Sequence, residues 1–458
     1  MRGEDGSVAQ ARRNVTITAA IAGLAGLLFG YDTGIVAGAL LTITPEFGLN
    51  SLQAGLVVGA VPIGAVGGAW FASYGADKYG RRTLILISAA IFIAGAVVSA
   101  IAPDSFILIV SRVVIGAGIG VASAVAPVYI SEVAPADMRG GLVTFFQLAV
   151  TIGILVAYLV GLAFTDLNEG WRWMLGLGAV PALILAIGIL RLPHSPRWLM
   201  MQDDTEGAKS ALEKVRPAGP EAIDLEIQQI RDSTGPDTSR WSDLKAPAVK
   251  AALLVGIGLA VLQQITGIYT VIYYAPTIIQ STGVDSASSA ILASLGVGII
   301  NVFMTVVAMR LLDRVGRRTL LFIGVTGMSV SLFALGLAFI NGMPETVSTV
   351  MAIGSLMLFV SSFAISLGPI FWLLNAEVYP LAVRGKAAAA GTMTNWFFNF
   401  LVSVTFLSLI ELLTETGAFW LYGSIGLVTL WFCWKFVPET KGKTLEQVDA
   451  IFERRAKD

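Results

Sequence analysis

Reactive and metal-binding side chains are scarce in this chain of 458 residues. It has one cysteine, Cys433, and one histidine, His194. A single cysteine cannot form a disulfide within the chain, and a single histidine cannot build a histidine-rich metal site. We therefore expect no metal site and no bound cofactor, and we expect Cys433, which lies in an apolar run, to be a packing residue.

Charge is scarce as well. Asp, Glu, Lys and Arg together make up 13% of the residues, and the formal net charge is −1. A nucleic-acid-binding surface needs many Lys and Arg side chains close together to neutralise phosphates. No segment of this sequence concentrates them in that way, so no nucleic-acid partner is expected.

Signals of an enzyme are missing too. The run Gly116-Ala117-Gly118-Ile119-Gly120 lacks the spacing, the preceding strand and the downstream acid of a dinucleotide-binding motif. Small residues in an apolar segment instead predict close packing between helices. No nucleophile, base and orienting group come together anywhere in the pattern, and we expect no enzyme.

Apolar residues are abundant, by contrast, at 55% of the chain, and the mean hydropathy is +0.77. These values are typical of a membrane protein. A helix needs about 20 apolar residues to cross the hydrocarbon core, and the sequence divides into twelve such segments, which predicts an all-α membrane protein. The predicted spans are residues 15–41, 51–74, 83–102, 105–130, 141–164, 171–191, 250–280, 287–311, 318–340, 347–375, 385–409 and 417–436.

Basic residues predict the orientation of these spans, because loops rich in Lys and Arg stay in the cytoplasm. With both termini inside, the outer turns contain a single basic residue, Arg172, and eight acids. The remaining basic loop residues then fall on the inner side. The sequence therefore predicts a multi-pass protein with cytoplasmic termini.

The second half of the chain repeats the first. The segment 77–84, DKYGRRTL, returns at 313–320 as DRVGRRTL, with an offset of 236 residues. Glu132-Val133-Ala134-Pro135 returns at 377–380, and 193–197 has a looser echo at 438–442, both with an offset of 245 residues. Parallel repeats of six spans around a central site are typical of transporters. We expect an N-terminal six-helix bundle (1–195), a cytoplasmic helical linker (196–248), a C-terminal six-helix bundle (249–437) and a cytoplasmic tail helix (438–458).

Two charged residues lie inside apolar spans. Asp32 is in the first span and Arg112 in the fourth, each roughly 10 to 14 Å from the outer end at 1.5 Å per residue. A charge at such depth is costly and by default marks a proton site, a water-filled path or an ion pair. Burial favours the neutral acid and a guanidinium favours the carboxylate, so a switch between these environments would carry a proton. We expect Asp32 and Arg112 to meet and to couple transport to protons, the alternative being a static pair that fixes helix packing.

Several motifs together resemble the sugar porter branch of the major facilitator superfamily over nearly the whole chain. The doubled DxxGRR loops alone would indicate only the superfamily. The more specific segments are EVAPADMRG (132–140), PHSPRWL (193–199), QQITGIYTVIYYAP (263–276), GPIFW (368–372), the segment 377–385 and PETKGKTLEQV (438–448). The resemblance implies a twelve-helix fold in which the first-span Asp and the fourth-span Arg serve proton coupling.

A sugar site requires many donors and acceptors and an apolar face for the C–H surfaces, which amides and tryptophans supply. The resemblance implies sugar contacts from Gln147, Gln263, Gln264, Asn301, Trp372 and Asn395, and we add Trp396 and Tyr269 as candidates. Each amide alone could equally be an interhelical hydrogen bond. Tyr269 stands where the family usually has Asn, so it is expected to narrow the pocket, alter hydroxyl preference or contact another ring.

Charged residues at the cytoplasmic helix ends form the last candidate set. Loop solvation alone would explain each, but they recur in pairs, and the resemblance implies ion pairs that hold the inner side shut in the outward-facing state. The predicted gate residues are Asp77, Arg81, Arg82, Glu132, Arg139, Asp313, Arg317, Arg318, Glu377 and Arg384. His194 replaces the usual Glu of the family's PESPR pattern; it would make the linker pH-sensitive or have no role at the surface.

The sequence thus predicts a proton-coupled importer of a monosaccharide, a hexose such as glucose or galactose, or xylose. An uncoupled facilitator and a sugar sensor are the alternatives. Expected partners are the sugar, the proton and membrane lipid, for a monomeric protein. The short outer turn from Thr42 to Asn50 and the lack of an outward glycosylation sequon favour a bacterial inner membrane.

Overall fold

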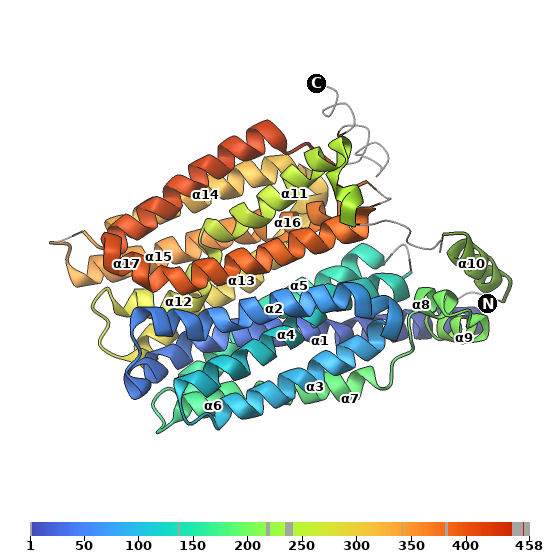
Figure 1. Ribbon diagram of the computed structural model, residues 1–458, viewed down its shortest axis with the longest axis horizontal. Coiled ribbons are helices and arrows are strands. Elements are labelled where there is room, and N and C mark those ends of the chain that lie inside the picture. Colours follow the sequence, from blue (N-terminus) through green and yellow to red (C-terminus); the bar gives the residue numbers. More distant parts are fainter. Residues whose placement is uncertain are drawn as a thin grey trace.

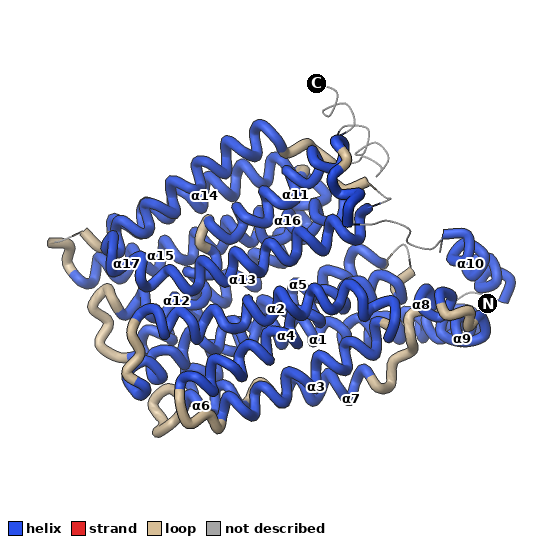
Figure 2. Tube along the Cα trace, viewed as in Figure 1, coloured by secondary structure: helices blue, strands red, loops and turns tan. Residues whose placement is uncertain are grey.

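The computed structural model describes residues 2–135, 138–216, 220–233, 241–340, 342–380, 383–441 and 452, and within these residues it contains helices and no strand (Figure 2). The elements in chain order are α1 (Arg2–Phe47), α2 (Ser51–Tyr79), α3 (Arg81–Ala100), α4 (Ser105–Val133), α5 (Arg139–Phe164), α6 (Gly170–Gly176), α7 (Ala179–Ile189), α8 (Pro196–Met201), α9 (Thr205–Val215), α10 (Pro220–Ser233), the 3₁₀ helix η1 (Trp241–Lys245), α11 (Pro247–Ile265), α12 (Ile268–Gln280), α13 (Ala287–Val315), α14 (Arg317–Leu337), α15 (Glu345–Ala364), α16 (Leu367–Glu377) and α17 (Arg384–Phe436).

Eleven helical segments of the described chain are long and apolar enough to cross a membrane. The last of them, α17, has 53 residues and includes Thr414, whose φ of 64° and ψ of 168° are not helical. A straight helix of that length would extend for about 80 Å, far more than a bilayer needs. The chain reverses at Thr414, so α17 supplies two crossings, and the twelve predicted spans are all present.

The spans form two six-helix bundles, which we call the N-half (α1–α7) and the C-half (α11–α17). They lie side by side with their helices nearly parallel, and α8, α9 and α10 project from one end (Figure 1). We call that end the linker end and the opposite one the far end. The segment 196–248, predicted as a helical linker, contains α8, α9 and α10. Pro220 begins α10, a position that proline favours. The predicted tail helix lies outside the described residues apart from Phe452.

Small residues bring the helices of the N-half into close contact. A Cβ added to Gly116 or Gly120 on α4 would overlap the carbonyl oxygens of Val61 or Ala65 on α2. The backbones therefore touch where the sequence predicted close packing, and van der Waals contact replaces the hydrophobic effect that is missing inside a membrane. This packing holds α4, and with it Arg112, against the rest of the bundle.

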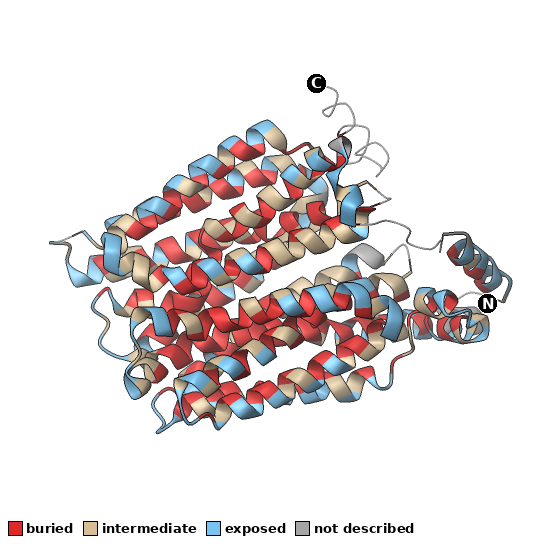
Figure 3. Ribbon diagram, in the orientation of Figure 1, coloured by how far each residue is buried: buried red, intermediate tan, exposed pale blue. Residues whose placement is uncertain are grey.

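Burial follows the same organisation. Buried residues concentrate inside each bundle and where the halves face each other, and the outward faces of the helices are exposed (Figure 3). Large apolar side chains on those outward faces, such as Leu254, Ile299, Phe303 and Trp434, are exposed. In a protein of this hydropathy such faces are the lipid-contacting surface.

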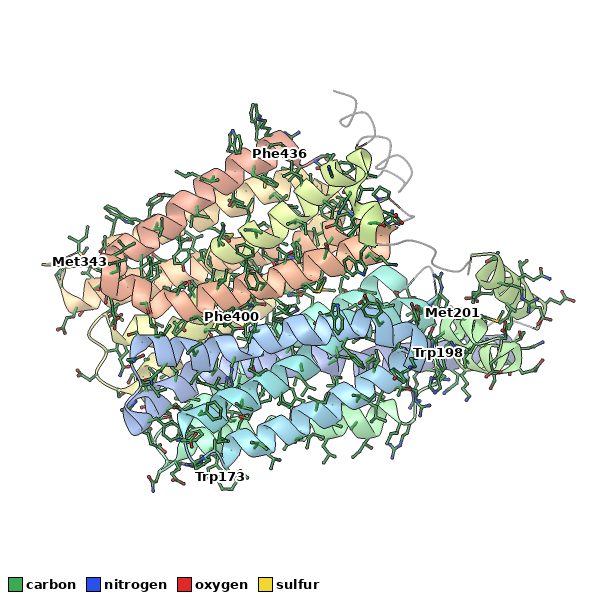
Figure 4. All side chains as sticks on the ribbon, viewed as in Figure 1. Trp173, Trp198, Met201, Met343, Phe400 and Phe436 are labelled. Carbon is green, nitrogen blue, oxygen red and sulfur yellow. The ribbon has the colours of Figure 1, made fainter. Side chains whose placement is uncertain are left out.

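The two halves touch most closely near the far end. The Ser51 hydroxyl on α2 bonds to the Glu411 carboxylate on α17, and Tyr158 on α5 donates to the Ile272 carbonyl on α12 at 2.9 Å. Phe400, on the same helix as Glu411, lies at the boundary between the bundles (Figure 4). The far end is therefore closed by contacts between the halves.

Candidate functional site

A buried ion pair occupies the interior of the N-half. Asp32 on α1 is 4% exposed and Arg112 on α4 is 1% exposed. The guanidinium faces the carboxylate with both Nη atoms, each 3.4 Å from an Asp32 oxygen, and its Nε donates to the Val57 carbonyl on α2 at 2.7 Å. The structure thus brings together the two charges that the sequence places in different spans.

The geometry of this pair is loose. Charge-assisted N–H···O bonds are usually about 2.7 to 2.9 Å long, whereas both bonds here are 3.4 Å. Burial costs several kcal/mol per ion, and a long pair recovers less of that cost than a short one. Neutralising Asp32 therefore removes a weak contact, while Arg112 keeps its bond to Val57. This arrangement is suited to reversible protonation.

A second buried polar group lies in the C-half and is centred on Gln263 of α11. Its Nε2 donates to the carbonyls of Leu367 (2.7 Å) and Gly368 (3.3 Å), at the start of α16. Its Oε1 accepts from Asn395 of α17 at 2.7 Å and from Gln264 at 3.1 Å. These bonds join α11, α16 and α17 at one point.

Among the described residues, three buried polar atoms on the helices of this network have no hydrogen-bond partner. They are Oε1 of Gln264, Nε1 of Trp396 and Nδ2 of Asn399. Buried polar atoms in proteins are nearly always paired, so an unpaired acceptor and an unpaired donor in one region suggest a ligand that can supply both bonds. The Trp396 ring also contacts Phe29 of α1, with 5.1 Å between ring centroids, and so lies against the N-half.

A cavity of about 90 Å³ lies between the halves. Of the predicted sugar contacts, Gln147 (α5), Tyr269 (α12) and Asn301 (α13) line it. Gly368, whose carbonyl accepts from Gln263, also lines it, so the amide network lies directly behind the cavity wall. Thr144 and Leu312, near the linker ends of α5 and α13, extend the lining towards the linker end.

The remaining candidates lie outside the cavity lining. Gln263, Gln264 and Asn395 are buried in the network behind it, Trp396 is buried against Phe29, and Trp372 is half-buried with its ring edge-on to Phe371. Sequence reasoning missed the cavity threonines Thr144, Thr151 and Thr305. Their hydroxyls each donate to a backbone carbonyl three or four residues earlier, a common arrangement in membrane helices that gives no sequence signal of a ligand site.

Two tyrosines lie between the cavity and the ion pair. Tyr269 stacks on Tyr273, with 5.1 Å between centroids and 29° between planes. Of the three roles expected for Tyr269, which were a narrower pocket, an altered hydroxyl preference and contact with another ring, the ring contact is observed. Tyr273 is close enough to Asp32 and Arg112 to interact with their charges. The aromatic stack therefore links the cavity lining to a ring that lies within electrostatic range of the buried charges.

The repeated charges at the linker end form matching groups in the two halves. In the N-half, Arg81 lies 3.2 Å from Glu132, and Glu132 accepts from Ser195. In the C-half, Arg317 lies 3.6 Å from Glu377, and Glu377 accepts from Thr440 at 2.9 Å. These residues are related by the offsets of the sequence repeat.

The other predicted gate residues mostly bond to nearby groups. Asp77 pairs with Arg81 at 3.1 Å. Arg82, Arg318 and Arg384 donate to the carbonyls of Leu190, Trp434 and Tyr379, respectively. The side chains of Arg139 and Asp313 lie outside the described residues. The ion pairs of Arg81 with Asp77 and Glu132 lie within the N-half, and the ion pair of Arg317 with Glu377 lies within the C-half.

Comparison with known proteins covers nearly the whole chain. Residues 18–452 match the family model described as sugar (and other) transporter. The chain is 40% identical to a D-xylose transporter of Levilactobacillus brevis over 94% of both chains. It is 38% identical to the galactose-proton symporter of Escherichia coli, covering 94% of this chain and 92% of the relative.

Solved structures give the same picture. The chain is similar to the xylose transporter XylE from E. coli in a partially occluded inward open conformation, with a TM-score of 0.83, 32% identity, and coverage of 94% of this chain and 100% of that one. XylE bound to 6-bromo-6-deoxy-D-glucose gives a TM-score of 0.81 at 32% identity, with coverage of 96% and 99%. The predicted twelve-helix major facilitator fold is confirmed.

Proposed function

The chain belongs to the sugar transporter family, whose members are transporters and not enzymes, and we propose that it carries a monosaccharide across the membrane together with a proton. The observation that carries the proton part of this proposal is the loose, fully buried pair of Asp32 and Arg112. A charge pair so deep in a membrane protein is energetically costly, and such residues are usually kept for a function.

The sugar binds between the halves, in the cavity lined by Gln147, Tyr269 and Asn301. Amide groups donate and accept hydrogen bonds to hydroxyls, and the apolar lining covers the C–H surfaces. Closure of the halves around the sugar brings it to the unpaired atoms of Gln264 and Trp396. The site holds no net charge, which suits a neutral ligand.

Protonation of Asp32 neutralises the carboxylate and frees Arg112 from it. The change reaches the sugar cavity through the Tyr273–Tyr269 stack, because Tyr273 lies within electrostatic range of the pair and Tyr269 lines the cavity. Sugar and proton thereby favour the same conformation. Such a shared preference is the thermodynamic requirement for coupling.

The linker end faces the cytoplasm in this proposal, as the distribution of basic residues predicts. With the far end closed and the cavity reaching towards the linker end, the structure is inward-facing. In the outward-facing state the two halves close at the linker end, where the repeated charges of Arg81, Glu132, Arg317 and Glu377 gain partners across the interface. Residues 1–195 and 249–437 are then the two moving bundles, 196–248 the linker and 438–458 the tail.

The relatives named above point to xylose and galactose as substrates to test, and the glucose analogue bound in XylE adds glucose. Tyr269 brings a phenol to the cavity where the resemblance leads one to expect an amide, so it is the residue most suited to alter hydroxyl preference. A competition series of hexoses and pentoses identifies the preferred sugar. The transporter acts as a monomer in lipid, in a bacterial inner membrane.

The test uses purified protein in proteoliposomes with a pH-sensitive dye inside. Added sugar should carry protons with it and shift the internal pH, and an imposed pH gradient should drive sugar above its equilibrium level. Sugar flux without any proton movement would leave a facilitator and refute coupling. Sugar binding without flux would leave a sensor and refute transport.

A further inference from the structure

The sequence repeat pairs Glu439 of the C-half with His194 of the N-half, at an offset of 245 residues. The Glu439 carboxylate lies at the first turn of α14. One oxygen accepts from the backbone N–H of Arg317 at 3.1 Å and the other from that of Arg318 at 3.0 Å. A helix N-terminus carries a partial positive charge and unpaired N–H groups, so the carboxylate is well placed there.

Gly80 precedes α3 with a positive φ of 83°, as Gly316 precedes α14 with a φ of 102°. Among the described residues, no carboxylate accepts a hydrogen bond from the first backbone N–H groups of α3 as Glu439 does at α14. The Trp198 ring covers Gly80, and its Nε1 donates to the Asp77 carbonyl at 2.9 Å. His194 stacks on this ring, 4.9 Å between centroids. Trp198 lies at the linker end of the N-half (Figure 4).

Beside His194 is an open pocket of about 420 Å³ with basic walls. Its charged lining residues are Arg82, Arg191, Lys214 and one acid, Asp204, which caps α9 through the N–H of Gly207. Across the described part of the chain, no carboxylate forms an ion pair with any of the three basic side chains, and Nδ1 of His194 is buried without a hydrogen-bond partner. The pocket therefore holds an excess of positive charge that the protein does not neutralise.

We propose that this pocket binds a phosphate group, carried by an anionic lipid headgroup or by a soluble phosphate ester. The pocket is lined by His194, at the position where the other half has Glu439. Three cations exceed the charge of one carboxylate, whereas a phosphate monoester carries up to two negative charges and several acceptor oxygens. Arg82 is held in position by its bonds to the carbonyls of Ile189 and Leu190, so its guanidinium is already oriented.

His194 contributes a hydrogen bond and no charge. Burial and the nearby Arg82 guanidinium lower the pKa of the His194 imidazole below its usual value, so the ring is neutral at neutral pH. A neutral imidazole has one N–H to donate and does not add to the repulsion among the basic side chains. Ser210, also in the pocket lining, offers a hydroxyl.

The test uses the full chain in phosphatidylcholine nanodiscs, titrated calorimetrically with inorganic phosphate. Wild type should show saturable binding. His194→Glu, which builds in the carboxylate found in the C-half, should weaken binding at least tenfold, and Lys214→Gln, which removes one exposed charge, roughly fivefold. Arg197→Gln is the matched control, because Arg197 is exposed on α8 outside the pocket lining. This variant should bind phosphate as wild type does.

A second arm identifies the source of the phosphate. Native mass spectrometry counts phosphatidic acid, whose headgroup is a phosphate monoester, retained by the purified wild type and the same variants. Retention that falls in His194→Glu assigns the pocket to lipid, and binding of inorganic phosphate without such retention assigns it to soluble esters. If neither ligand binds in a way that His194→Glu and Lys214→Gln both reduce, the proposal is wrong. Neither assay contains sugar, so this result is independent of the transport proposal.

Discussion

The two halves of the molecule share their linker-end geometry but not their interiors. Arg81, Glu132 and Ser195 of the N-half repeat as Arg317, Glu377 and Thr440 of the C-half, with the same partners. The interiors differ, because the N-half contains the Asp32–Arg112 pair and the C-half contains the amide network around Gln263. In the proposed function, the duplicated features serve the conformational change of both halves, and the unduplicated ones serve the proton and the sugar.

The largest expected effect comes from removing the charge that only the N-half has. Asp32→Asn cannot gain or lose a proton, so accumulation of sugar driven by a pH gradient should fall to the background level, while sugar exchange at equal pH continues. Uptake and counterflow in the same proteoliposomes measure the two activities. Asp166→Asn, an exposed acid of the same half, is the control and should accumulate sugar normally. Full accumulation by Asp32→Asn would show that the pair is static.

Removing the centre of the C-half network should have the next largest effect. Gln263→Ala removes the hydrogen bonds to the Leu367 carbonyl and from the Asn395 amide, which keeps only its bond to the Ala260 carbonyl at 3.2 Å. Each lost bond costs about 0.5 to 1.5 kcal/mol. Sugar affinity, measured by equilibrium binding, should fall about tenfold or more. Gln280→Ala, at the far end of α12, removes a glutamine outside the cavity lining and should bind sugar normally. An unchanged affinity in Gln263→Ala would show that the amide network takes no part in sugar binding.

The duplicated gate should respond symmetrically and more weakly. Glu132→Gln removes the carboxylate that pairs with Arg81 in the N-half, and Glu377→Gln removes the one that pairs with Arg317 in the C-half. Ion pairs that the carboxylates gain across the linker-end interface, in contact with water, contribute at most about 1 kcal/mol each. Each variant should therefore shift the population towards the inward-facing state by up to roughly fivefold. Distances between spin labels on the linker ends of the two halves report this population. A shift in only one variant would show that the two halves are not equivalent. If neither variant shifted the population, these residues would not form a gate.

The smallest effect concerns Glu439, which has no acidic counterpart in the N-half. Burial acts to raise the pKa of its carboxyl, but hydrogen bonds from the N–H groups of Lys441, Arg318 and Arg317 outweigh burial and leave the pKa below its usual value. A lowered folded-state pKa means stabilisation at neutral pH that is lost as the pH falls from about 4 through the folded pKa. Glu439→Gln should therefore lower Tm slightly at pH 7 and match wild type in acid. Glu415→Gln, in the far-end turn, is the control, and a Tm difference for Glu439→Gln that persisted at low pH would contradict this assignment.

Much of the architecture was readable from local patterns. The twelve apolar segments correspond to twelve crossings. The doubled loops correspond to the matching clusters at the linker end, and the glycine-rich stretch at 116–120 corresponds to close packing between α2 and α4. In a bilayer every backbone group must bond within its own helix, so hydropathy and length alone locate the spans. The joining of two spans into α17 across Thr414 is a local backbone detail that hydropathy does not report.

The site was only partly readable. Gln147, Tyr269 and Asn301 line the cavity, but Gln263, Gln264 and Asn395 bond to one another behind its wall, and the cavity threonines gave no signal. An amide has the same sequence signature whether it faces a ligand, another amide or a backbone carbonyl. Which of these it meets depends on the rotation of each helix and on breaks such as the one before α16, and these are set by packing between distant segments.

By itself, the sequence determined that this chain crosses the membrane twelve times as two related halves. It also determined that an acid and a guanidinium lie within the spans at similar depth. Both conclusions come from properties that are read along the chain: span length, repetition and charge in an apolar run. Only the tertiary structure decided that Asp32 and Arg112 face each other across α1 and α4, that Tyr269 stacks on Tyr273, and that the halves meet at the far end. Those facts depend on how helices far apart in the chain pack together, and the interaction energies involved are defined only once the helices are in contact.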